Sequence, residues 1–146
     1  MAQHLAGRSL WTCIEGEAVR RYLNALFFTV RAKGLSLTLP LNCDSPHERR
    51  DYRMTVLPRG QGRITVLLEL MSRAPQDRLV PVADGPPVRC GICCAPQADH
   101  PGDGVQPPRS CIGTVEIVCC DCRGRALEQI AAIADRRGST SGDWLV

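Results

Sequence analysis

The sequence predicts an α+β fold made of two units, a helix packed on a small antiparallel sheet and a cysteine-rich segment that follows it. Three observations lead to this prediction. Apolar residues recur at helical spacing over residues 14–33, they alternate at strand spacing in three later segments, and seven of the nine cysteines lie between Cys90 and Cys122. A helix laid on an antiparallel sheet buries the apolar faces of both elements, which is a common α+β layer arrangement.

The first predicted element is an amphipathic helix over residues 14–33. Its apolar residues follow three- and four-residue spacing, and mostly charged or polar residues lie between them. Acidic residues in the first turn and basic residues in the last suit the helix dipole, and Gly34 provides the C-terminal stop. The apolar positions are Ala18, Val19, Tyr22, Leu23, Leu26, Phe27 and Val30.

Three strands are predicted after this helix, over residues 35–41, 52–57 and 63–71. Leucine alternates with other residues throughout the first of them, so the leucines share one face, and Pro40 favours a position at the edge of the sheet. The second and third strands flank a glycine-rich loop at residues 58–62, which predicts a hairpin.

A domain boundary is predicted near Gly85. Residues 74–88 contain four prolines and an Asp-Gly pair, a composition that interrupts regular structure and marks connections between units. The sequence therefore predicts an α+β domain over residues 1–85, a metal-binding domain over residues 86–138 and a tail over residues 139–146.

The cysteines of the second domain form two C-x-x-C pairs, Cys90 with Cys93 and Cys119 with Cys122. Each C-x-x-C turn can place two sulfurs on one ion, and zinc prefers four such ligands in a tetrahedron. We therefore predict a structural zinc ion bound by these four cysteines. Four neighbouring residues remain as alternative ligands, for the same ion or for a second one: Cys94, His100, Cys111 and Cys120.

The order of elements around these pairs is that of a treble clef, because a strand at residues 113–118 leads into the second pair and a helix at residues 123–137 follows it. The motifs Cys90-Gly-Ile-Cys93 and Val118-Cys119-Cys120-Asp121-Cys122, with this helix, resemble the zinc-binding domain of the ClpX unfoldase family over residues 89–138. The gap between the pairs is longer here. The family's domain binds adaptors and substrates and dimerises, so the resemblance implies protein contacts.

The sequence argues against an enzyme. Four cysteines fill the coordination shell of zinc, whereas a catalytic zinc keeps one position open for water or substrate. The zinc deaminase pattern, H-E-x-x-H and the nucleotide-binding loops do not occur in the chain. We therefore predict a protein without catalytic activity.

The charge distribution leaves two classes of binding protein. Residues 1–85 carry twelve of the eighteen Lys and Arg residues but only eight of the fifteen Asp and Glu residues. A four-thiolate zinc site would add a charge of about −2 to the other half, which disfavours phosphate binding there. One hypothesis is thus a nucleic-acid-binding protein that uses the N-terminal half, and its candidate residues are Arg49, Arg50, Arg53, Arg59 and Arg63.

We favour the other class, a protein-interaction module such as an adaptor or inhibitor of a larger protein machine, encoded by a bacterium or a phage. Glu48 and Asp51 interrupt the arginine cluster, which is typical of a solvated loop of mixed charge. The outer face of the sheet, with Leu57, Leu67 and Met71, is either a dimer surface or is covered by the second domain. The sequence leaves the oligomeric state open.

A cytoplasmic location is expected. The N-terminus lacks the basic start and apolar run of a signal peptide, and the longest apolar stretch, around residues 26–30, is too short to span a bilayer. The odd number of cysteines and their C-x-x-C spacing favour reduced thiols and a metal over disulfides.

Overall fold

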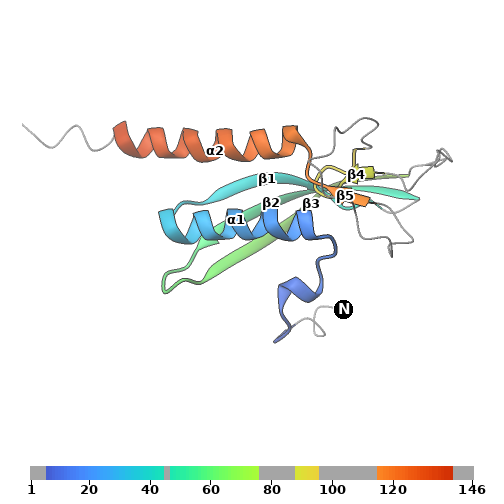
Figure 1. Cartoon of the computed structure of the whole chain (residues 1–146), viewed down its shortest axis with the longest axis horizontal. Coiled ribbons are helices and arrows are strands. Elements are labelled where there is room, and N and C mark those ends of the chain that lie inside the picture. Colours follow the sequence, from blue (N-terminus) through green and yellow to red (C-terminus); the bar gives the residue numbers. More distant parts are fainter. Residues whose placement is uncertain (1–5, 45–46, 76–87, 96–114, 140–146) are drawn as a thin grey trace, which may run out of the picture.

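In the residues that the structure describes, two α-helices combine with a three-stranded antiparallel sheet and a small two-stranded sheet, as the coarse α+β prediction expects (Figure 1). The structure is a computed structural model that describes residues 6–44, 47–75, 88–95 and 115–139. Its elements are a short 3-10 helix η2 (Leu10–Thr12), α1 (Glu17–Lys33), β1 (Leu37–Asn42), β2 (Glu48–Pro58), β3 (Ile64–Pro75), β4 (Val88–Cys90), β5 (Val115–Ile117) and α2 (Cys120–Ser139).

The sheet has the order β1-β2-β3, with β2 in the centre. Leu37 lies opposite Val56 in the first strand pair, and a hairpin joins β2 to β3. The Arg59 N–H donates to the Arg63 carbonyl at 2.9 Å and closes the hairpin. The register shifts beside Tyr52, where the pairing passes over Met71 and leaves a bulge in β3.

Several element boundaries differ from the sequence-based prediction. Strand β1 begins at Leu37 and not at residue 35, β3 ends at Pro75 and not at residue 71, and α2 begins at Cys120 and not at residue 123. Helix α1 begins at Glu17 and not at residue 14, because Gly16 before it has a φ of 83° that no helix continues. Strand β2 begins at Glu48 and not at residue 52, within the segment of mixed charge that the sequence indicates is a solvated loop. The reason is charge pairing: Glu48 lies 3.8 Å from Arg73 of the neighbouring strand β3 and 3.6 Å from Arg50 of its own strand, so charge pairs support β2 where apolar alternation is absent.

The core lies between α1 and the sheet. From α1 it takes one helical stripe, and from β1, β2 and the preceding turn it takes the side chains that face this stripe. The buried residues are Val19, Leu23, Leu26, Phe27, Val30, Leu35, Leu37, Leu39, Met54 and Val56. The same cluster continues into Cys90, Ile92, Val118, Cys119, Cys122 and Ala126. The cysteine-rich segment therefore shares one apolar core with the helix and sheet.

Helix α2 lies along the outer edge of β1 (Figure 1). The side-chain amide of Gln129 accepts a hydrogen bond from the Thr38 N–H at 2.7 Å and donates one to the Thr38 carbonyl. Near the other end of α2, Arg137 donates to the carbonyls of Lys33 and Gly34 at 2.9 and 2.8 Å. These bonds fix α2 beside the sheet and satisfy carbonyl groups at the end of α1.

Within the described ranges, neither helix has the length and apolar character needed to cross a membrane. The domain boundary predicted near Gly85 lies outside the described residues, and so does the chain from residue 140 onward.

Candidate metal centre

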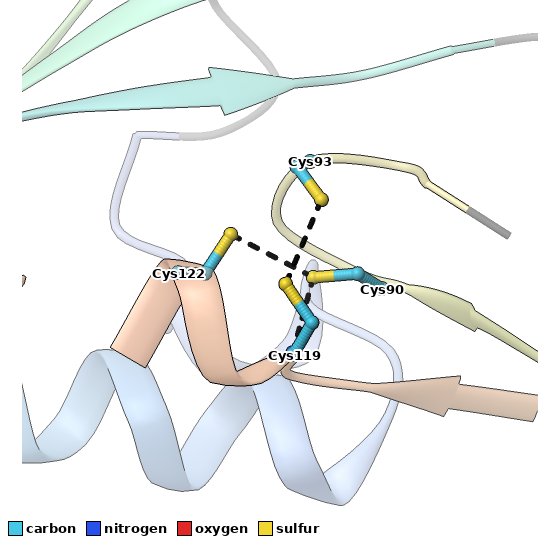
Figure 2. A group of neighbouring side chains, drawn as sticks. All are labelled: Cys90, Cys93, Cys119 and Cys122. Atoms are coloured by element: carbon cyan, nitrogen blue, oxygen red, sulfur yellow. Dashed lines mark hydrogen bonds between the residues drawn. The ribbon is translucent and has the colours of Figure 1, made fainter. Parts of the chain in front are cut away.

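The four cysteines of the two C-x-x-C pairs lie together in the folded chain. Cys90 ends β4, Cys93 lies in the turn after it, Cys119 immediately precedes α2, and Cys122 lies in the first turn of that helix. Their four sulfurs all lie within 4.8 Å of one another and point toward a common centre (Figure 2). This arrangement is a potential metal-binding site.

The spacing of the sulfurs fits a tetrahedral ion. The Sγ atoms of Cys90 and Cys122 are 3.8 Å apart, and so are those of Cys93 and Cys119. Zinc–sulfur bonds of about 2.3 Å in a tetrahedron place the sulfurs about 3.8 Å from one another. Thiolate sulfur is also a donor that zinc prefers. The group is therefore compatible with zinc in both geometry and chemistry.

Backbone hydrogen bonds hold the two halves of the site together. Strand β4 pairs in parallel with β5, where Cys90 lies opposite Ile117. The Gly91 N–H donates to the Ile117 carbonyl at 2.8 Å, and the Asn42 N–H donates to the Ile92 carbonyl at 2.7 Å. The first bond ties the turn after Cys90 to the strand that leads to Cys119, and the second ties it to β1.

The electrostatics of the site differ between its thiols. Burial alone would raise the pKa of Cys90, but the backbone N–H groups of Cys119 and Ile92 point at its sulfur, each at 3.4 Å. Such bonds stabilise the thiolate, and the pKa of Cys90 is lowered to about 7. Burial raises the pKa of Cys93 and that of Cys122. A cation at the centre would favour the deprotonation of Cys93 and Cys122, which their burial opposes.

This difference predicts that metal binding releases protons and strengthens with pH. Below a pH of about 7 even Cys90 is largely protonated, so protons compete with the metal for its sulfur and for those of Cys93 and Cys122, whose pKa values are raised. We expect zinc affinity to fall steeply as the pH is lowered from 8 to about 6. Competition with a chromogenic chelator across this range measures the affinity, and an affinity independent of pH would contradict the prediction.

The alternative ligands lie outside the four-sulfur group where the structure describes them. Cys94 is buried, but its sulfur lies 3.5 Å from the Asn42 carbonyl. Cys120 is exposed on the first turn of α2. The remaining two, His100 and Cys111, lie outside the described residues.

Tyr22 is a neighbour of the site that the sequence did not single out. Its hydroxyl donates to the Cys122 carbonyl at 3.3 Å, so α1 contacts the metal-binding turn directly. Burial, followed by the negative charge of the nearby cysteines, raises the pKa of Tyr22 to about 12. In the sequence Tyr22 appears only as one of several apolar positions of a helix, which carries no sign of this contact.

The arginines proposed for nucleic-acid binding lie along β2 and its hairpin, mostly beside partners. Arg49 lies 3.1 Å from Asp51, Arg50 lies 3.6 Å from Glu48, and Arg53 lies 3.4 Å from Glu69. At the hairpin, Arg59 donates to the Thr65 hydroxyl at 3.0 Å and Arg63 to the Gln61 side chain at 3.4 Å. The carboxylates reduce the positive potential that phosphates would meet.

No protein-family model, curated protein or solved structure matches this chain. The resemblance to the ClpX zinc-binding domain therefore stays a prediction from the motifs alone.

Proposed function

We propose that this chain is a non-enzymatic protein-interaction module whose fold is stabilised by structural zinc. The observation that carries the proposal is the closed group of four sulfurs at Cys90, Cys93, Cys119 and Cys122 within the hydrophobic core. Four thiolates would complete a tetrahedral shell and leave no position for a substrate. Such an ion would stabilise the fold, and the surface of the folded chain would then bind the partner protein.

A treble-clef-like arrangement is part of this proposal. Strand β4 leads into the turn with Cys90 and Cys93. Strand β5 leads into the second pair, Cys119 and Cys122, at the start of α2. This order supports the treble-clef prediction and the likeness to the zinc-binding domain of the ClpX family. In that family the domain binds adaptors and substrates. The parallel pairing of β4 with β5 is a feature of this chain that the motifs did not predict.

A protein partner agrees better with the surface than a nucleic acid does. Large apolar side chains are exposed on both helices, with Phe28 on α1 and Leu127 on α2. We take these two side chains as candidate contact points for a protein, whereas three of the five candidate arginines, Arg49, Arg50 and Arg53, have carboxylates beside them. We propose an adaptor or inhibitor of a larger protein, of bacterial or phage origin, acting in the cytoplasm, where thiols stay reduced for zinc.

Partner capture from the native host tests this proposal. We expect the tagged, zinc-loaded chain to retain a specific protein and the double variant Phe28→Glu/Leu127→Glu to lose it. The matched control Asn24→Glu/Ala131→Glu adds the same charge at exposed positions of the same helices and should retain the protein.

Titration with duplex and single-stranded DNA separates the two classes of partner. We expect no binding at low salt. Affinity that falls steeply with salt, together with capture unaffected by the Phe28→Glu/Leu127→Glu change, would favour the nucleic-acid hypothesis instead.

A further inference from the structure

The two edges of the sheet differ. Gln129 of α2 bonds to the backbone of β1 and covers that edge. At the opposite edge, the described part of the chain places no second strand beside β3. Leu67 and Leu68 are 50% and 57% exposed although they point to opposite faces of the sheet, and Leu70 and Met71 are exposed as well. Stable proteins usually protect a long edge with charges, proline or short length, but residues 64–68 are all uncharged.

We propose that this edge of β3 pairs with the same edge of a second copy of the chain, in antiparallel orientation, to form one continuous sheet. The inference goes beyond the proposed function, because it does not depend on the identity of a partner protein. A symmetric pair uses the same surface on both copies, so each residue must find a suitable residue on its own strand. The hydrogen-bonding pattern and the charges of β3 meet this requirement of self-matching.

The backbone pattern restricts how two β3 strands can pair. The hydrogen bond between Arg59 and Arg63 defines one bonded pair of the hairpin, and such pairs alternate along antiparallel strands. Thr65, Leu67 and Glu69 therefore bond toward β2. The alternate residues direct their N–H and C=O groups away from β2. These are Ile64, Val66, Leu68 and Leu70. Pro58, which has no N–H, lies opposite Ile64 and agrees with this alternation.

Charge and the length of the paired segment together select one register among those that join these outward groups. A two-fold axis at Leu68 would place Arg63 opposite Arg73 of the other copy, and an axis at Glu69 would oppose two glutamates. An axis at Leu67 opposes no like charges and pairs the whole bulge-free segment of residues 64–70 with itself, whereas an axis at Val66 would pair only residues 64–68 of β3. The axis at Leu67 places Glu69 opposite Thr65 of the other copy, whose hydroxyl binds the Arg59 guanidinium, so opposite charges approach across the seam.

The same register matches the apolar side chains. Leu67 meets Leu67 of the other copy on one face, while Leu68 meets Val66 and Leu70 meets Ile64 on the other face. Both copies then place α1 on the same face of the continuous sheet, since the two-fold axis is perpendicular to it. A foreign strand would satisfy the backbone, but the self-matching sequence of β3 favours a second copy.

Sedimentation equilibrium of the full, zinc-loaded chain tests the pairing. We expect a dimer, and we expect Leu67→Lys to raise its dissociation constant about 100-fold or more because two lysines would face each other at the axis. Leu10→Lys, at an exposed leucine of η2 outside the proposed seam, is the matched control and should leave the dimer intact. A monomer at every accessible concentration, or equal effects of the two variants, would overturn the proposal.

Residue-level amide hydrogen exchange provides a second readout. In the dimer, we expect the amides of Val66 and Leu68 to exchange as slowly as those of Leu67 and Glu69, which bond toward β2 within the hairpin. Leu68→Pro removes an outward N–H without breaking a bond to β2, so it should yield a folded monomer. Slow exchange at Val66 and Leu68 in a monomer would mean that this chain covers its own edge, and would also overturn the proposal.

Discussion

Removal of the metal should unfold the protein well beyond the cysteine segment. Structural zinc contributes on the order of 10 kcal/mol of apparent binding free energy, and domains of this size have net stabilities of only about 5–15 kcal/mol. Cys90, Cys119 and Cys122 belong to the same apolar cluster as Val19 and Leu23 of α1. Loss of the ion would therefore disturb the packing of α1, and not only the chain around the two cysteine pairs.

The experiment combines a chelator with two alanine variants. We expect Cys122→Ala, like the chelator, to abolish stoichiometric zinc and the near-UV circular dichroism of Trp11 and Tyr22. Cys120→Ala is the matched control, because this exposed thiol lies two residues away on the same helical turn and outside the four-sulfur group. An unchanged near-UV spectrum after metal removal, or zinc lost equally in both variants, would show that the ligand assignment is wrong.

Phe27→Ala should destabilise the protein by about 3–5 kcal/mol, the usual cost of emptying the space of a buried aromatic ring. Phe27 is 2% exposed, and its ring centre lies 5.7 Å from that of Trp11. Its neighbour Phe28 is 68% exposed. Phe28→Ala should change the free energy of unfolding by no more than about 0.5 kcal/mol.

Urea unfolding of the two zinc-saturated variants measures this difference, with the metal held constant so that binding does not mask it. The comparison uses the same residue type on the same helix, so helix propensity cancels. Similar losses of unfolding free energy in the two variants would contradict the prediction. They would mean that α1 presents a different face to the sheet from the one described.

The helix and the cysteine group were predictable because each follows from a short, regular spacing. The stripe of Val19, Leu23, Leu26, Phe27 and Val30 is buried as its periodicity indicates, and the spacing of the C-x-x-C pairs brings four sulfurs together. Both patterns arise from local geometry, in which a helical turn or a tight knuckle fixes which side chains are neighbours.

Other features depend on contacts between distant polar groups, which leave no periodic pattern. Nothing near Gln129 indicates that its amide would bond to the backbone of Thr38, and Tyr22 gives no sign of its bond to Cys122. The polar start of β2 is stabilised by pairing with β3 rather than by burial. Such contacts are specified by the complete fold, so they could not be read from either segment alone.

The placement of α2 has a consequence for how the chain assembles. Helix α2 starts at the cysteine group, and its Gln129 bonds to the backbone of Thr38 in β1. In each copy of the chain, the β1 edge of the three-stranded sheet is therefore closed to further strands. In the proposed dimer, association through β3 would then stop at two copies. If α2 were released on metal loss, both ends would accept a neighbour and growth would have no natural limit, which links metal occupancy to solubility.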